Sequence, residues 1–346
     1  MNIKAIGLDT AKSTFQLHGV DAADRAVLRK RLTRAKLLEF FAQLAPCLIG
    51  LEACGAAHHW ARKLTALGHR VRLIPAQYVK AFVKRNKNDA ADAEAICEAL
   101  LRPNMRCVPV KQPWQQDIQS LHRIRSAAVA ERTALSNQLR GLLAEYGLIA
   151  PKGLTKLRQT LPAILEDADN GLSGLMRTLI DQRREALERL DQLIAGYDRQ
   201  VAQIAREHPD AERLITAPGI GPLTATALIA RVSDPHHFAN GRGLAASLGL
   251  TQRQHSTANQ QRLLSISKAG DGYVRMLLIH GARAVLANAH RHPQDRLCAW
   301  ALAVKTRRGK NIATVAVANK LARIAWAILA HACPYRSSAL RPAQSA

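Results

Sequence analysis

The chain has 346 residues, a length that allows about two domains at roughly 150 residues each. Apolar residues make up 48% and charged residues 22%, which favours a packed core and excludes a wholly disordered chain. Fifty lysines and arginines against 26 acids give a net charge of +24. This excess indicates a polyanionic partner, with nucleic acid as the first candidate.

The sequence predicts no membrane span, signal peptide, disulfide framework or zinc site. Its longest charge-free run, residues 214–230, is interrupted by prolines and glycines, and the N-terminus reaches Asp9 without an apolar signal run. The six cysteines form no C-x-x-C pair, which favours buried or free thiols. We therefore expect a cytoplasmic protein with no membrane partner.

Residues 1–110 have the pattern of an α/β domain. Apolar or alternating runs predict strands over 3–8, 14–20, 26–32, 47–51 and 71–74, and amphipathic stretches predict helices over 35–44 and 58–67. A further helix is expected after Asn88, a good cap residue. Three hairpin-type strands followed by strands that alternate with helices predict a sheet with mixed pairing.

Residues 111–208 predict two long helices around a segment marked by Pro151, Gly153 and Pro162. Apolar residues recur at spacings of three and four in both helices: Leu135, Leu139, Leu142 and Tyr146, then Leu187, Leu190, Ile194, Tyr197, Val201 and Ile204. Such seams fit an antiparallel hairpin within one chain and a coiled coil between chains equally well.

Residues 209–336 form a third part, mainly helical and strongly basic, and residues 337–346 are expected to be a disordered tail. From residue 235 onward there are 16 lysines and arginines and only two acids. Between two helical stretches lies A-P-G-I-G-P-L-T-A, residues 217–225, in which Gly219 and Gly221 would let backbone N–H groups approach phosphates. This resembles a helix-hairpin-helix DNA-binding motif; the alternative is an ordinary glycine turn between packed helices.

Four acidic residues in the first domain could carry chemistry. Asp9 ends the first strand in G-L-D, Glu52 ends the fourth in G-L-E-A-C-G, and Asp89 and Asp92 share one face of the predicted helix. If they converge, their oxygens would select Mg²⁺, with Mn²⁺ as the alternative, and a two-ion site would act on a phosphodiester. The alternatives are turn and helix-dipole roles and, for Asp9, the phosphate loop of an actin-like ATPase.

A candidate nucleophile lies in a polar, loop-like segment near residue 256. A serine hydroxyl such as that of Ser256 can attack a phosphodiester where cations stabilise the developing charge. His255 precedes it, and Ser265 and Ser267 are rivals of the same type. Basic residues lie nearby in the sequence: Arg253, Arg262, Lys268 and Arg275.

Taken in order, these motifs resemble the DEDD transposases of bacterial insertion sequences. The motifs are G-L-D, G-L-E-A-C-G, K-N-D-A-A-D-A, A-P-G-I-G-P-L-T-A and R-Q-H-S-T with I-S-K-A-G-D-G-Y-V-R. The resemblance spans residues 3–330 and is strongest to the IS-one-ten group, in its IS-eleven-eleven branch. It implies an N-terminal RuvC-like (RNase H-like) domain, a coiled-coil middle region and a C-terminal transposase domain.

The resemblance also implies roles for individual residues. Asp9, Glu52, Asp89 and Asp92 would bind the metal ions, and Ser256 would form a covalent phosphoserine link to DNA. We expect nucleic-acid contacts from the two glycines of the 217–225 motif and from the four basic residues near the serine. The chain departs from the family after the serine, where Ala258-Asn259-Gln260 stands in place of small glycines and a lysine. This departure predicts a stiffer loop with one phosphate contact fewer.

Family members are recombinases guided by a structured bridge RNA that pairs with donor and target DNA. They assemble as homo-oligomers, dimers or tetramers, in which the metal site of one subunit meets the serine of another. The resemblance therefore implies RNA-guided strand exchange in the bacterial cytoplasm, at the nucleoid. Two alternatives remain: a RuvC-like structure-specific endonuclease that uses water, and a non-catalytic nucleic-acid-binding protein.

Overall fold

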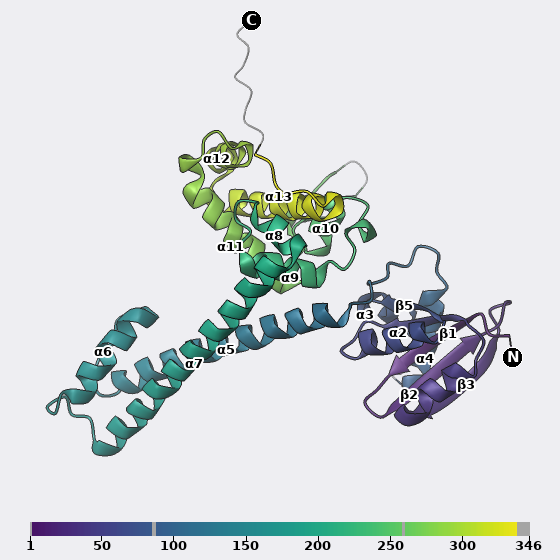
Figure 1. The fold of residues 1–346 in the computed structure, drawn as a ribbon, viewed down its shortest axis with the longest axis horizontal. Coiled ribbons are helices and arrows are strands. Elements are labelled where there is room, and N and C mark those ends of the chain that lie inside the picture. Colours follow the sequence, from purple (N-terminus) through teal and green to yellow (C-terminus); the bar gives the residue numbers. More distant parts are fainter. Residues whose placement is uncertain (1, 85–87, 258–259, 338–346) are drawn as a thin grey trace, which may run out of the picture. The chain divides into compact units, whose positions relative to one another are not determined.

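A computed structural model of the chain describes residues 2–84, 88–257 and 260–337. It consists of two compact units, Met1–Pro113 and Trp114–Ala346, called unit 1 and unit 2 here (Figure 1). The predicted helical region and the predicted C-terminal region belong to the same unit, because the first helix of unit 2 packs into both. The expected tail, apart from residue 337, lies outside the described residues, as do Ala258 and Asn259.

Unit 1 is built on a five-stranded sheet with the strand order β3-β2-β1-β4-β5. The strands are β1 (Ala5–Thr10), β2 (Thr14–Val20), β3 (Ala26–Thr33), β4 (Leu48–Glu52) and β5 (Arg70–Ile74). β2 pairs antiparallel with both β1 and β3, whereas β4 pairs parallel with β1 and β5. The mixed pairing predicted from the sequence is confirmed.

Helices cover both faces of this sheet. The helical elements of unit 1 are η1 (Arg34–Lys36), α1 (Leu37–Ala42), α2 (Ala57–Ala66), α3 (Ala76–Val79), η2 (Lys80–Phe82) and α4 (Asp89–Leu100). Side chains alternate along a strand, so Leu8 of β1 packs with α1 and α2 while Ala5 packs with α4. The sheet is thus the middle layer of three.

Unit 2 begins with three helices: α5 (Pro113–Ala144), α6 (Leu154–Glu166) and α7 (Gly174–Glu207). α5 and α7 pack against each other antiparallel, since Arg125 pairs with Asp198 and, one heptad later in α5, Arg132 pairs with Asp191 at 3.1 Å. The hairpin within one chain, one of the two alternatives, is therefore present. A coiled coil between chains stays a prediction.

Two details of this region differ from the prediction. Leu143, not Leu142, is fully buried in the core shared by the three helices. The segment between α5 and α7 is not a simple connection, because it contains α6, with Pro162 inside that helix. The proline removes one backbone donor, and the amphipathic face of α6, with Leu157 and Leu161 buried, compensates by packing.

The rest of unit 2 packs around one large apolar core. Its elements are α8 (Pro209–Ile215), α9 (Pro222–Arg231), η3 (Pro235–His237), α10 (Gly241–Ser247), β6 (Gln252–Gln254), β7 (Leu263–Ile266), α11 (Gly272–Asn288), η4 (Ala289–Arg291), α12 (Arg296–Arg308) and α13 (Lys310–His331). In the described part of the chain, α13 alone has the length and mean hydropathy, 1.5, of a membrane span. Its Val317 and Leu321 lie in the core, and since a core helix passes the same test, these properties are weak evidence for a span.

Candidate active site

The parallel pair β1 and β4 brings Asp9 and Glu52 to the same end of the sheet. The register pairs Gly7 with Gly50 and Leu8 with Leu51, and each acid follows one residue later. Because side chains alternate along a strand, both acids project from the face that carries the two glycines. Both are half-buried.

Helix α4 lies directly on this glycine face. A Cβ atom at Gly7 would lie 2.1 Å from the carbonyl oxygen of Ala93 and 2.8 Å from the Cβ of Cys97. A Cβ atom at Gly50 would lie 3.0 Å from a methyl group of Leu100. Since glycine has no Cβ, the helix backbone can approach the strands this closely, and the first turn of α4 is held near the acids.

The first turn of α4 carries the other two acids. The Oδ1 atom of Asn88 accepts a hydrogen bond from the backbone N–H of Ala91 at 2.7 Å, which caps the helix as predicted. Asp89 and Asp92 follow in the first turn, the former exposed and the latter half-buried.

The electrostatics of Asp9 show that these acids act on one another. Burial, followed by the negative charges of Asp92 and Asp89, raises the pKa of Asp9 to about 6. Glu52 contributes in the same direction, and a hydrogen bond from the backbone of Thr10 opposes the shift. The four carboxylates, called the carboxylate site below, therefore share one electrostatic environment.

The donor chemistry of the carboxylate site fits a hard divalent cation, because all four groups offer only oxygen. Like charges that raise the pKa of a neighbour would be relieved by a cation among them. In the arrangement seen, no three His, Cys, Asp or Glu side chains of the described residues gather closely enough to hold an ion. Metal ligation by these residues stays a prediction.

One further contact at this end of the sheet was missed from the sequence. The hydroxyl of Thr10 lies 3.3 Å from the Sγ atom of Cys54, which links the end of β1 to the loop after β4. The only sign of this contact in the sequence is position, because Thr10 follows Asp9 by one residue and Cys54 follows Glu52 by two.

Ser256 lies between the strands β6 and β7, which form an antiparallel hairpin. Ser256 itself lies in the polar connection between the two strands, as expected, whereas the short strands on either side were not predicted. Residues 252–254 are polar and exposed on both faces, so no apolar alternation signals the strand. Ser256 is exposed, and the side-chain amide of Gln254 donates a hydrogen bond to its Oγ at 2.8 Å. Residues 252–266 as described are called the serine hairpin below.

The rival serines have other contacts. Arg253 donates a hydrogen bond to the Oγ of Ser265 at 3.4 Å. The Oγ of Ser267 accepts one from the backbone N–H of Ala269, also at 3.4 Å. Both contacts lie within the hairpin and its base. His255 is exposed, and its backbone N–H donates a hydrogen bond to the carbonyl oxygen of Arg262 at 2.9 Å.

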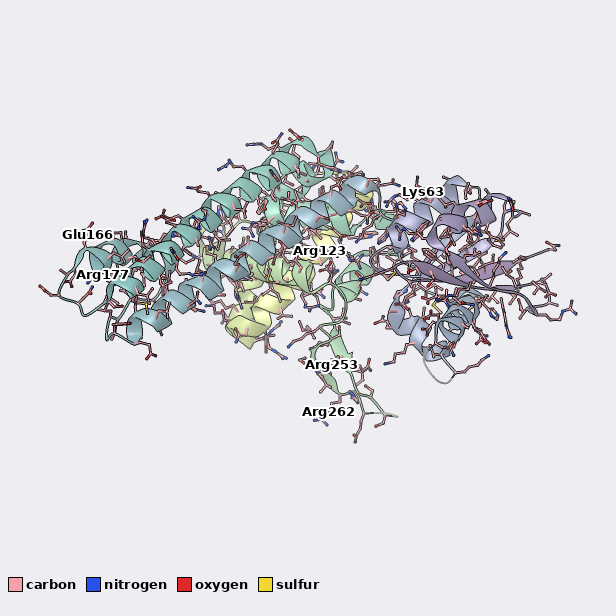
Figure 2. The ribbon with its side chains drawn as sticks, turned by 90° about the horizontal axis from the view of Figure 1, so that it is seen from below. Lys63, Arg123, Glu166, Arg177, Arg253 and Arg262 are labelled. Atoms are coloured by element: carbon pink, nitrogen blue, oxygen red, sulfur yellow. The ribbon has the colours of Figure 1, made fainter. Side chains whose placement is uncertain are left out.

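The four basic residues expected to bind nucleic acid divide into two kinds. Arg253 and Arg262 project from the hairpin, as Figure 2 shows, and Lys268 is exposed at its base. Arg275 instead donates to the carbonyl oxygens of Leu248, at 2.9 Å, and Ala269, at 3.2 Å. Arg275 therefore braces the two chain segments from which the hairpin emerges.

The glycine motif at 217–225 lies between α8 and α9, as predicted. Gly219 has a φ of +79°, and a Cβ atom there would lie 2.7 Å from the carbonyl oxygen of Gly281 in α11. A Cβ atom at Gly221 would meet nothing within 4 Å. Helix packing thus explains Gly219, and Gly221 alone has open space for the approach of a phosphate.

Comparison with known proteins shows the family to which the chain belongs. Residues 6–148 match a family model of the IS110 DEDD transposases, and residues 211–311 match the "Transposase IS116/IS110/IS902 family". The chain is 48% identical to a "Probable family 20 transposase" of Pseudomonas aeruginosa over 337 residues, which cover 97% of this chain and 99% of the relative. The chain belongs to the IS110 family of DEDD transposases.

This IS110-family transposase has further relatives of the same kind. It is 42% identical to the transposase for insertion sequence element IS1111A of Coxiella burnetii, over 98% of this chain and 93% of the relative. It is 37% identical to the transposase for IS1328 of Yersinia enterocolitica, over 94% and 97%. The protein is a DNA transposase of an insertion sequence, in a family that typically uses divalent metal ions. The alternatives of a non-catalytic binding protein and of an actin-like ATPase are therefore wrong.

Proposed function

We propose that this transposase exchanges DNA strands through a covalent phosphoserine intermediate, guided by a bridge RNA. Ser256 is the nucleophile, and the carboxylate site holds the divalent ions. The observation that carries the proposal is the packing of α4 on Gly7 of β1, because it brings the first turn of α4, with Asp89 and Asp92, toward the end of the sheet that carries Asp9 and Glu52. The serine and the RNA rest on the family resemblance.

In the carboxylate site, Asp9, Glu52, Asp89 and Asp92 would hold Mg²⁺, with Mn²⁺ as the alternative, as a two-ion site. When bound, such ions neutralise the carboxylates and polarise the scissile phosphate. Burial and the charges of Asp92 and Asp89 raise the pKa of Asp9 to about 6, so a bound cation would favour its ionised form. Removal of Asp9 should therefore weaken metal binding.

At the serine hairpin, the Oγ of Ser256 attacks the scissile phosphorus. An Oγ–P bond forms while a P–O bond of the DNA breaks; the serine proton passes to solvent and the departing strand oxygen takes up a proton. The hydroxyl of the exchanged strand then reverses this step. The amide of Gln254 donates to the Oγ and so stabilises the negative charge that develops on it. Strand exchange by this route leaves no break for another enzyme to join.

The assembly follows from the charge distribution and from the family. Donor DNA, target DNA and the guide RNA bind to basic surfaces that include Arg253, Arg262 and Lys268, with strong salt dependence. The carboxylate site of one copy acts with the serine of another in a dimer or tetramer. The protein works at the bacterial nucleoid.

The test is the detection of a protein–DNA adduct on a denaturing gel, with Mg²⁺, donor DNA and the RNA transcribed from the element's flank. Wild type and the control Ser265→Ala should form the adduct, and Ser256→Ala should not. Cleavage by Ser256→Ala at the wild-type rate, without any adduct in wild type, would identify a water-using RuvC-like endonuclease and overturn the proposal. An adduct that forms equally well without the RNA would overturn the guidance alone.

A further inference from the structure

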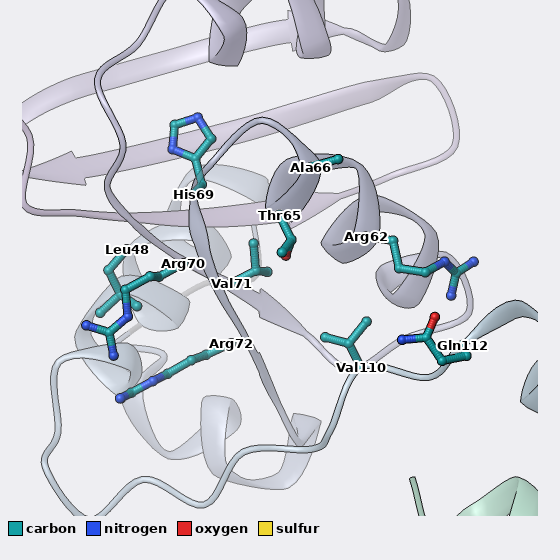
Figure 3. Close-up of a pocket in the computed structure, with 10 residues that line it drawn as sticks. All are labelled: Leu48, Arg62, Thr65, Ala66, His69, Arg70, Val71, Arg72, Val110 and Gln112. Carbon is teal, nitrogen blue, oxygen red and sulfur yellow. The ribbon is translucent and has the colours of Figure 1, made fainter. Parts of the chain in front are cut away.

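A basic hollow lies at the outer edge of the unit 1 sheet, where β5 is the last strand. Its volume is about 730 Å³, and its walls come from α2, β4, β5 and residues 110–112 (Figure 3). The charged side chains in its lining are Arg62, Arg70 and Arg72, and no acidic residue of the described chain lines it. It is called the arginine hollow below.

The arginine hollow is separate from the carboxylate site. The register pairs Leu48 with Arg70, Gly50 with Arg72 and Glu52 with Ile74, so the two arginines lie four and two residues before the level of Glu52. At ~3.3 Å per residue, this puts Arg70 roughly 13 Å and Arg72 roughly 7 Å from that level along the strands. A ligand in the hollow therefore does not occupy the carboxylate site.

The arginines are spread along the hollow and do not converge on one point. Figure 3 shows Arg70 and Arg72 projecting on one side, while Arg62 lies with Gln112 on the other. Two residues of strand separate Arg70 from Arg72, about 6.6 Å along the chain. Among the described residues, no ion pair or hydrogen bond engages the side chain of either. This spacing fits an extended polyanion better than a single small anion.

The other side chains of the hollow do not compete for the ligand. His69 is buried, with its Nδ1 accepting a hydrogen bond from the backbone N–H of Cys47 at 3.2 Å. Its Nε2 then donates to the carbonyl oxygen of Phe41 at 3.0 Å. Both ring nitrogens are satisfied in the neutral form, so His69 is part of the wall.

A second hollow, on the opposite half of the sheet, has a different character. It is lined by basic residues such as Arg29 and Lys84, but also by Asp24, Glu94 and Glu98. Its charges are balanced within the chain, and Lys84 pairs with both glutamates at 2.9 and 2.7 Å. Arg70 and Arg72, whose side chains have no ion pair among the described residues, thus differ from Lys84 of the second hollow.

We propose that the arginine hollow is a second DNA contact, which binds the sugar-phosphate backbone of a duplex away from the carboxylate site. Guanidinium groups bind phosphate oxygens, and such contacts position DNA without reading its sequence. No Phe, Tyr or Trp side chain of the described residues lines the hollow, whereas single-strand binding relies on bases stacked on such rings. The inference rests on the DNA activity of the family and is independent of Ser256 and of RNA guidance.

The test measures the binding of full-length protein to a DNA duplex by fluorescence anisotropy over a range of salt. Each lost phosphate contact lowers the slope of log K against log salt by ~0.9, so Arg70→Gln/Arg72→Gln should lower it by about 1.8. Between about 50 and 200 mM salt, the variant should therefore lose roughly tenfold less affinity than wild type. Arg70→Lys/Arg72→Lys should keep the wild-type slope.

The matched control is Arg29→Gln/Arg31→Gln, the same charge change two residues apart on β3, the other edge strand of the sheet. A slope that falls no further in the hollow variant than in this control overturns the proposal. So does a fall seen only with an RNA duplex or a single strand.

A rival role for arginines on an edge strand is to prevent pairing between sheets of different copies. In that case Arg70→Gln/Arg72→Gln would self-associate on size exclusion with an unchanged slope, which also overturns the proposal. If the double variant melts early, Arg72→Gln alone must still lower the slope by about 0.9. The adduct experiment on Ser256 is unaffected by either result.

Discussion

The carboxylate site of unit 1 and the serine hairpin of unit 2 differ in how many packed strands and helices support their side chains. Asp9 ends β1, which has a strand on either side and α4 across its face. The serine hairpin has only two strands, and even its Leu263 is 56% exposed. A two-stranded hairpin without a core is marginally stable by itself.

The hairpin is held at its base instead. Arg275 binds two carbonyl oxygens there, and the side chain of Asn319 donates to the carbonyl of Leu250 at 3.1 Å. The backbones cross so closely that a Cβ at Gly249 would lie 2.2 Å from the carbonyl oxygen of Ala269. Packing within unit 1 thus positions the carboxylate site. We expect Ser256, in contrast, to be positioned by bound DNA.

Removal of Asp9 should be the most damaging single change. Asp9→Asn keeps the shape of the side chain and removes a charge that the carboxylate site needs to hold a cation. We expect strand transfer to fall by about 10³-fold, measured on donor DNA in vitro, since a metal ion contributes several kcal/mol to the barrier. Glu39→Gln, an equal charge change at an exposed position of α1, should have no effect. If Asp9→Asn retained more than a tenth of the activity, Asp9 would have no part in the chemistry.

Gly7→Ala tests whether core packing positions the acids. The added methyl group would meet the backbone of α4 and push the helix away from the sheet. Overpacking of this kind costs about 1–3 kcal/mol, seen as a lower melting temperature of unit 1, and strand transfer should fall with it. The control is Gly55→Ala, whose methyl group meets nothing within 4 Å. Equal melting temperatures for the two variants would contradict the close contact between α4 and β1.

The sequence was a good guide where local pattern and tertiary packing agree. Strands β2 and β3 begin where alternation predicts, and α4 begins at its Asn88 cap. These elements are set by side-chain period and by capping, which neighbouring residues reveal. Asp9 and Glu52 could be named for the same reason, because a buried strand that stops at an acid is visible in the sequence.

The sequence was a poorer guide where a residue contacts a distant partner. Arg275 was expected to bind nucleic acid, yet its partners are the carbonyl groups of Leu248 and Ala269. Gly219 was expected to face phosphate, yet it lies against Gly281. No local pattern distinguishes an arginine that binds DNA from one that binds protein carbonyl groups, because the carbonyl partner can lie far away in the sequence, as Leu248 does for Arg275.

Arg275→Ala tests the contacts at the base of the serine hairpin, which is less well packed than the carboxylate site. The loss of two hydrogen bonds to carbonyl oxygens should cost about 1–2 kcal/mol locally, because the carbonyls can be rehydrated. Adduct formation by Ser256 should fall by roughly tenfold, with near-normal DNA affinity. Arg283→Ala, on the exposed side of the same helix, is the control. A fall in affinity with an unchanged adduct yield per bound DNA would make Arg275 a DNA contact after all.

The pH dependence of stability gives the smallest effect and tests the carboxylate site without DNA. The pKa of Asp9 is raised from 3.8 to about 6 in the folded chain, so the folded state holds this proton more tightly. Protonation of Asp9 therefore stabilises the folded state fully below pH 4, and this stabilisation is lost as the pH rises through 6. Because Asp9 is partly exposed to solvent, we expect only about 1 kcal/mol.

The measurement is thermal unfolding of wild type and Asp9→Asn in a chelator between pH 4 and 7, since their difference cancels the titration of other groups. The melting temperature of the variant should rise relative to that of wild type as the pH rises. Mg²⁺ at pH 7 should raise the melting temperature of wild type alone. Parallel curves would mean that the charges of Asp89 and Asp92 do not act on Asp9. The melting temperature of Asp9→Asn could rise relative to wild type in the chelator while Mg²⁺ has no effect on wild type. This result would mean that the acids repel one another yet hold no ion in the free protein. The carboxylate site would then be completed only in the assembled complex with DNA.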